Sequence, residues 1–105
     1  MSSLESANVT AAAAQIARAI REKRLVSFTY RLLPRLAQPF ALGVKKGVLE
    51  VQALQVGGAT SSGSLPHWRR FLLRDVSELQ VTEQVFRLAE LVPVTDFDSL
   101  VAVYG

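Results

Sequence analysis

The sequence of 105 residues contains no cysteine and a single histidine, His67. Without cysteine there can be neither disulfides nor thiolate metal sites, which favours a reducing compartment. Apolar runs such as residues 9–14 are too short to span a bilayer, and no basic stretch at the N-terminus leads into an apolar segment. We therefore expect a cytoplasmic protein that does not bind a membrane.

Side chains suited to catalysis are also scarce. His67 has no thiol to activate, and a serine partner could come only from the Gly/Ser-rich residues 57–64. One histidine with scattered carboxylates lacks a metal-ligand spacing, and Gly57-Gly58 is not followed by the helix and lysine of a phosphate-binding loop. We expect a protein that is not an enzyme and that needs no metal or cofactor.

Acidic residues are rare before residue 75. Through Arg74 the chain carries eleven Lys and Arg against three Glu, a balance of +8, whereas residues 75–105 carry −5. A basic body with an acidic tail indicates either an anion-binding face or internal pairing of the tail with the body. The sequence leaves both interpretations open.

A chain of this length predicts one domain with one core. We expect a disordered segment over residues 1–7 and a single domain over residues 8–105. Ala12, Ile16 and Ile20 recur with helical spacing, which predicts a helix over residues 8–24. A small antiparallel barrel is expected over residues 25–82, followed by a C-terminal extension over residues 83–105.

Within the expected barrel the hydrophobic period changes to two. Residues 25–31 predict a strand that Pro34 interrupts, and Pro39 opens a second strand that ends at Val44. Lys45-Lys46-Gly47 predicts a hairpin turn into a strand over residues 48–56. Leu54 and Val56 shift the phase of that strand, which indicates a bulge or a sharp bend.

The remaining pattern predicts a loop over residues 57–64 and two further strands, 67–73 and 76–81, joined at Arg74-Asp75. Asp96 is placed to cap one or two final helical turns. The fold class is therefore α+β: an N-terminal helix, a small twisted antiparallel β-barrel and an apolar C-terminal segment.

The order of these landmarks resembles the WYL domain, a module of bacterial regulators. That pattern has a short helix with a basic end, an aliphatic strand closing on Tyr, a Pro-x-x-Leu segment, a strand with Trp-Tyr-Leu, and a Phe-Arg-Leu-Asp-Arg-Ile strand-turn. The matching segments are residues 20–24, 26–30, 39–42, 49–53 and 71–76. Trp68, three residues before Phe71 and after a Gly/Ser-rich loop, is similar to short stand-alone members.

The chain departs from the WYL pattern at polar positions. Leu49-Glu50-Val51 replaces Trp-Tyr-Leu, Leu72 stands where the family often has a ligand-facing Arg, and Arg74-Asp75 inverts the usual order. The resemblance covers roughly residues 13–86. It implies an Sm-like or SH3-like barrel and a role in transcription regulation by sensing nucleic acid or a nucleotide-like ligand.

His67-Trp68-Arg69-Arg70 is the most informative tetrapeptide. Trp68 can stack on a base and the two arginines can pair with phosphates, but neighbours on a strand point to opposite faces. The alternative is that Trp68 is a core or rim aromatic with Arg70 beside it. The candidate ligand-binding residues are Tyr30, Arg31, Arg35, Lys45, Lys46, His67, Trp68, Arg69, Arg70 and Arg74.

Two functions follow. The first is a regulatory module that binds single-stranded nucleic acid or a nucleotide-like anion through a basic face, with Gln52 and Gln55 placed to read polar groups. The second is a protein-interaction domain that forms a homodimer through its apolar C-terminal residues. Those residues are Leu88, Leu91, Val92, Val94, Phe97, Leu100, Val101, Val103 and Tyr104.

Overall fold

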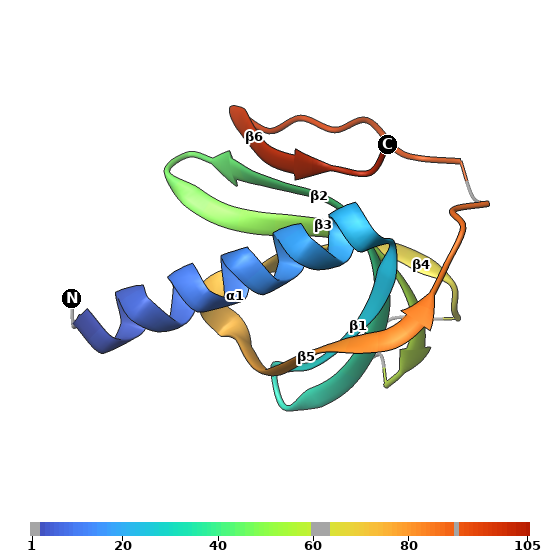
Figure 1. Ribbon diagram of the computed structural model, residues 1–105, viewed down its shortest axis with the longest axis horizontal. Helices are drawn as coiled ribbons and strands as arrows, with labels where there is room; N and C mark the ends of the chain where they lie inside the picture. The colour runs from blue at the N-terminus through green and yellow to red at the C-terminus, as the bar shows by residue number, and fades with distance from the viewer. Residues whose placement is uncertain (1–2, 60–63, 90) are drawn as a thin grey trace.

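A computed structural model describes residues 3–59, 64–89 and 91–105, with side chains from residue 8 onward. The α+β class is confirmed: one N-terminal helix precedes a six-stranded antiparallel sheet (Figure 1). The elements are α1 (Ser3–Glu22), β1 (Arg24–Tyr30), β2 (Leu33–Lys45), β3 (Val48–Gly58), β4 (His67–Leu72), the short 3-10 helix η1 (Leu73–Asp75), β5 (Val76–Val85) and β6 (Ser99–Val103).

Helix α1 begins earlier than predicted. Residues 3–7, where we expected disorder, belong to it, and residues 1–2 lie outside the described residues. Ile16 and Ile20 are buried as the helical spacing required. The helix ends at Glu22 because Lys23 adopts φ 56°, the left-handed conformation that closes many helices.

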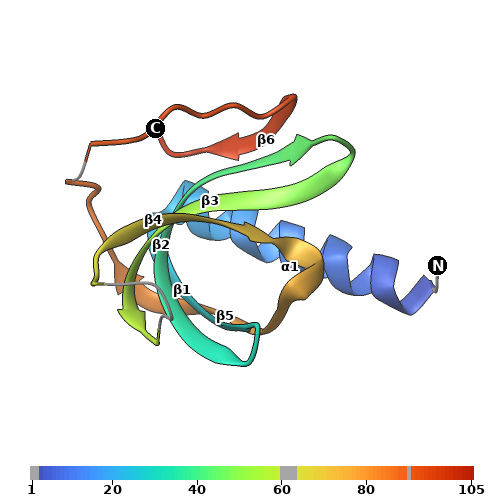
Figure 2. The same ribbon diagram turned by 180° about the vertical axis from the view of Figure 1, so that it is seen from behind.

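The sheet has the strand order β4-β3-β2-β1-β5, and β6 pairs with β2 beyond the end of β1. Among the described residues β4 does not pair with β5, so the expected closed barrel is wrong. The short helix η1 separates these two strands because it buries Leu73 in the core against α1. The result is an open, strongly curved sheet with α1 lying across one side (Figures 1 and 2).

Strand β2 begins at Leu33 and runs without interruption through both prolines, whereas the sequence predicted that Pro34 interrupts the first strand and that Pro39 opens the second. Pro34 lies near the strand's first residue, and Pro39 lies beside a register shift opposite β3. A proline, which lacks an N–H, is tolerated at such positions. The predicted hairpin is confirmed, with Lys46 at φ 51° and Gly47 at φ 79° forming its turn.

The predicted irregularity in β3 is also confirmed at Val56, although not at Leu54. The register steps from Ala37↔Gln55 to Leu36↔Gly57, which leaves Val56 as the extra residue. Leu54 is not out of phase, since it lies on the opposite face of the sheet from Gln55 and is buried there.

The core lies between α1 and the facing side of the sheet. Phe71 is its centre, with ring centroids 4.9 Å from both Phe28 and Tyr30 in edge-to-face packing. The predicted helical turn at Asp96 is wrong, because the chain there is irregular and continues into β6. No helix in the described part of the chain has the length and hydropathy needed to cross a bilayer.

Candidate functional site

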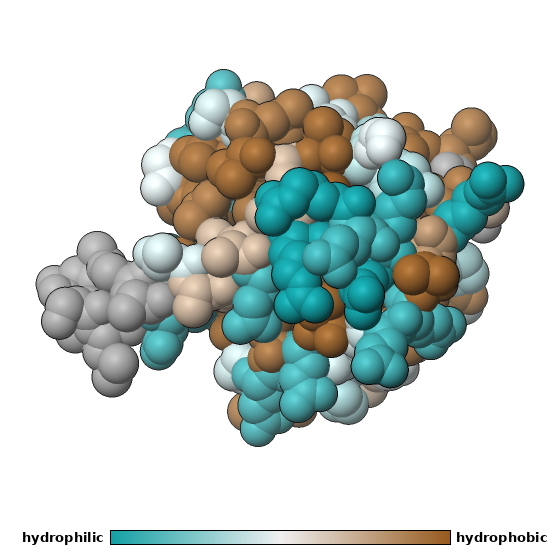
Figure 3. Space-filling model, viewed as in Figure 1, coloured by the Kyte–Doolittle hydropathy of each residue, from teal (hydrophilic) through white to brown (hydrophobic). Residues whose placement is uncertain are grey.

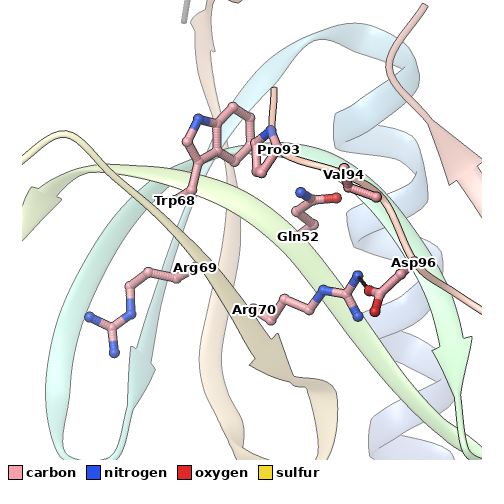
Figure 4. A pocket seen from close by; sticks show the side chains of 7 residues that line it. All are labelled: Gln52, Trp68, Arg69, Arg70, Pro93, Val94 and Asp96. Atoms are coloured by element: carbon pink, nitrogen blue, oxygen red, sulfur yellow. Dashed lines mark hydrogen bonds and ion pairs between the residues drawn. The ribbon is translucent and has the colours of Figure 1, made fainter. Parts of the chain in front are cut away.

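Strand β4 divides the sequence-predicted site residues between two faces. Trp68 and Arg70 lie opposite Leu54 and Gln52 of β3, and Arg69 points away from them (Figure 4). Arg69 instead shares its face with Phe71. Arg70 therefore lies on the same face as Trp68, whereas the guanidinium of Arg69 lies over Phe71 on the other face, and each face must be considered in turn.

Three guanidinium groups surround the packed rings of Tyr30 and Phe71. The Cζ atoms of Arg31 and Arg35 lie 5.3 and 5.7 Å from the Tyr30 ring centroid. Those of Arg35 and Arg69 lie 5.8 and 5.9 Å from the Phe71 centroid. We call Arg31, Arg35 and Arg69 the arginine cluster. These distances are within the range of cation–π attraction.

Arg35 is the buried member of the cluster, with only 4% of its surface exposed. Its Nη1 donates to Gln55 Oε1 at 3.2 Å and its Nη2 donates to the Tyr30 carbonyl oxygen at 3.2 Å. Its Nε is buried without a hydrogen-bond partner. Among the described residues no carboxylate pairs with Arg35.

The electrostatic setting of Arg35 is unfavourable to its own charge. Burial, then the positive charges of Arg69 and Arg31, lower the pKa of the Arg35 guanidinium, while Tyr30 acts in the opposite direction. Buried charges in proteins are normally paired. Among the residues that the structure describes, the buried charge of Arg35 therefore lacks the negative partner that buried charges normally have.

The backbone fixes this arrangement from two sides. Arg31 and Leu32 form the β1–β2 turn with φ values of 52° and 67°, which non-glycine residues rarely adopt. Opposite Arg35, Gly58 has φ 83°, and a Cβ there would lie 2.3 Å from the Pro34 carbonyl oxygen. Only glycine allows β3 to approach Arg35 this closely.

On the other face of the sheet, the cations are paired. Arg70 bonds Asp96 and lies 3.7 Å from a Glu50 oxygen, and its guanidinium carbon is 4.0 Å from the Phe97 ring centroid. Lys45 approaches Asp96 at 3.6 Å and Asp98 at 4.0 Å. Internal pairing of the acidic tail with the basic body therefore applies on this face.

A cavity of about 380 Å³ opens on that face, which we call the outer pocket (Figure 4). Gln52, Trp68, Arg69 and Arg70 come from the sheet, and Pro93, Val94 and Asp96 come from the C-terminal chain. Trp68 is half-buried and packs edge-to-face on Phe40, with ring centroids 6.0 Å apart. Trp68 thus packs on Phe40 and also lines the pocket.

The other predicted site residues lie apart. Tyr30 is buried, with its hydroxyl accepting from Leu72 N at 3.2 Å. His67 is exposed at the start of β4, and Lys46 is in the hairpin turn with its N–H 2.7 Å from Asp98 Oδ2. Arg74 is exposed and borders a cavity of about 780 Å³ beside α1.

Gln55 and Asp96 make contacts that the sequence did not predict. Gln55, expected on a polar face, is 0% exposed and holds Arg35 while donating to the carbonyl oxygens of Gly57 and Ala59. Asp96, expected to cap a helix, neutralises Arg70, and the pKa of its carboxyl is lowered by Arg70 and then by Lys45. Neither contact has a local sequence signal, since both join residues far apart in the chain.

Comparison with known protein families, with curated proteins and with solved structures found no match. The resemblance to the WYL domain therefore stays a prediction from the sequence.

Proposed function

We propose that this chain is a non-catalytic binding module for a phosphate-bearing ligand, a nucleotide or single-stranded nucleic acid, which it contacts through the arginine cluster. The observation that carries this proposal is the burial of Arg35 without a carboxylate partner in the described chain. A phosphate would supply the missing negative charge and accept hydrogen bonds from guanidinium groups.

The rings of Tyr30 and Phe71 are buried beneath the arginines, so they are closed to stacking by a base. Recognition would rest on phosphate rather than base identity, which implies binding that tolerates sequence. Arg31 is exposed and Arg69 is half-buried, so they would meet the ligand first. Arg35, which is buried beside them, would add a fixed positive charge that attracts the phosphate.

The test is a titration of a fluorescent oligonucleotide against the full chain at several salt concentrations. Each neutralised phosphate should steepen the log–log dependence of affinity on salt by about 0.7 for a single strand. Replacing Arg31 and Arg69 together by Ala should weaken binding at low salt by at least about tenfold and flatten the slope.

Arg18→Ala combined with Arg21→Ala is the matched control, because it also removes two arginines, both of them exposed on α1 and away from the cluster. Binding that falls equally in the control and in the cluster variant would show a nonspecific effect of net charge. Absence of binding at low salt would refute the nucleic-acid form of the proposal, and a parallel titration with a mononucleotide tests the small-ligand form.

A second candidate function is homodimerisation through the C-terminal residues. Exposed apolar side chains gather in this part of the chain, including Leu91, Val94, Leu100, Val101 and Val103. Figure 3 shows hydrophobic surface spread over the region of β6 and the β2–β3 hairpin. Such a surface is typical of an interface. Light scattering over a dilution series tests it, and a strict monomer would exclude it.

A further inference from the structure

Residues 93–104, which we call the C-terminal segment, are attached to the body of the protein by specific contacts. Besides the acidic residues described above, Thr95 Oγ1 donates to Gln52 Oε1 at 3.0 Å. The Tyr104 N–H donates to the Phe40 carbonyl oxygen at 2.7 Å, and β6 pairs with the second half of β2. The segment is thus held by side chains, by backbone bonds and by strand pairing.

The body has a surface shaped to receive this segment. A Cβ at Gly43 would lie 2.6 Å from the Phe97 ring and 2.6 Å from the Ser99 carbonyl oxygen, so only a bare glycine accepts Phe97 and β6 there. Arg70 covers the other side of the Phe97 ring. We call this surface, which includes Gly43 and Arg70, the acceptor surface. It is complementary to a segment with acidic and aromatic side chains, and Asp96 and Phe97 of the C-terminal segment supply them.

The connection between β5 and this segment is built differently. Phe86 stacks on Tyr104 and the Leu88 N–H donates to the Tyr104 hydroxyl, so the body contacts the segment as far as residue 88. Beyond it, residues 89, 91 and 92 have no regular secondary structure, and Leu91 is 94% exposed. Val94, near the start of the segment, is 86% exposed. Both apolar side chains are open to solvent in a single copy. A connection that changed direction would place them against another molecule.

We propose that two copies of this chain exchange their C-terminal segments, each docking on the acceptor surface of the other. Every contact of the segment would be remade between copies, and only the connection would change, which is the requirement for domain swapping. The outer pocket would then have walls from two chains: Gln52, Trp68 and Arg70 of one, and Asp96 of the partner subunit. The inference does not rest on phosphate binding, and it specifies how the second candidate function would be carried out.

A charge-exchange pair of full-length variants tests this. Arg70→Asp places two like charges together within one chain, and so does Asp96→Arg. When the two variants are refolded together, only a heterodimer with exchanged segments pairs opposite charges at both sites. Native mass spectrometry separates the species by mass. Random pairing gives as much heterodimer as the two homodimers together, and we expect exchange to raise this ratio of heterodimer to homodimers by at least about tenfold.

Arg21→Asp refolded with Glu83→Arg is the control pair, since both positions are exposed and lie outside the segment and its acceptor surface. Heterodimer at the statistical share, or equal enrichment in the control, would overturn the exchange while leaving ordinary dimerisation possible. Wild-type protein that stays monomeric at every concentration would overturn the exchange and dimerisation together. Neither result bears on the salt titration.

If a charge variant fails to fold, a disulfide cross-link between β2 and β6 tests the exchange instead. Val44 and Ser99 are directly paired across β2 and β6, and the chain has no cysteine of its own. Cysteines at directly paired positions in antiparallel strands are close enough for a disulfide. After Val44→Cys and Ser99→Cys are combined and oxidised at high concentration, exchange predicts a dimer on a denaturing gel that reducing agent dissociates. Intrachain disulfide alone would contradict it.

Discussion

Arg69 and Arg70 are neighbours in β4, but the two faces of the sheet give them opposite surroundings. Arg70 has carboxylates from Glu50 and Asp96 beside it. Arg69 lies over the core ring Phe71, next to the buried Arg35, and its charge lowers the Arg35 pKa. We call the side of the sheet that carries Arg70 the outer face and the side that carries Phe71 the core face. The acidic tail pairs with cations of the outer face, whereas Arg35 on the core face has no carboxylate partner in the described chain.

This difference separates two uses of the same residue type. On the outer face, arginine fixes the position of a chain segment, through ion pairs that are each weak when exposed. On the core face, the Arg35 guanidinium is buried against the rings of Tyr30 and Phe71. Removing this charge from water costs stability. A residue kept at such a cost is typical of a binding site.

The largest expected effect compares the ring under Arg69, Phe71, with the ring under Arg70, Phe97. Phe71 is 0% exposed and Phe97 is half-buried. Phe71→Ala should therefore destabilise the fold by about 3–5 kcal/mol. Phe97→Ala should cost only about 1 kcal/mol, since less surface is lost from a partly exposed site. Urea unfolding of both variants measures this. Equal losses would mean that the C-terminal segment is as much a part of the core as Phe71.

Gly43→Ala tests whether the outer face holds its segment by shape as well as by charge. The added Cβ would lie 2.6 Å from the Phe97 ring, so the segment must move. Overpacking of this kind typically costs about 1–3 kcal/mol. Hydrogen exchange should show β6 losing protection while β1 keeps it. Gly105→Ala is the control, because a Cβ there meets nothing within 4 Å and Gly105 is not among the glycines with positive φ.

Arg35→Met should separate stability from binding on the core face. Methionine retains much of the apolar stem and removes a buried charge that has no carboxylate partner. Removal of the buried charge favours folding, and loss of the hydrogen bonds to Gln55 Oε1 and the Tyr30 carbonyl oxygen opposes it. We therefore expect stability to change by no more than about 1 kcal/mol, with oligonucleotide affinity reduced at least about tenfold. Thermal unfolding and the salt titration measure the two effects. A clear loss of stability would show that Arg35 serves the fold rather than a ligand.

Much of the local structure could be predicted because its signals are local. The apolar spacing of Ile16 and Ile20 gave α1, and Lys46-Gly47 gave the hairpin. Alternation alone placed Trp68 and Arg70 on one face and Arg69 on the other. These features need only the nearest neighbours in the chain.

The sequence could not predict that the sheet stays open or which basic residues pair with the acidic tail. Contacts between residues far apart in the chain decide both. Leu73 reads as the last residue of a strand, and its burial under α1 is what separates β4 from β5. Asp96 reads as a cap, and its partner Arg70 is 26 residues away. For the same reason, nothing near Arg35 in the sequence indicates that Gln55 would hold it.

The smallest effect concerns pH and is confined to the outer face. Arg70 and then Lys45 lower the pKa of Asp96 below the ordinary value of 3.8. A carboxyl with a depressed pKa in the folded state adds stability above its ordinary pKa and loses it as the pH falls through the folded value. Asp96→Asn should thus lower the melting temperature slightly at about pH 6, and the difference from wild type should vanish towards about pH 2. Asp75→Asn, at an exposed aspartate of η1, is the control. A difference that persisted at low pH would show that the Asp96 side chain acts through packing or hydrogen bonding rather than charge, and the contrast between the two faces would then be one of shape.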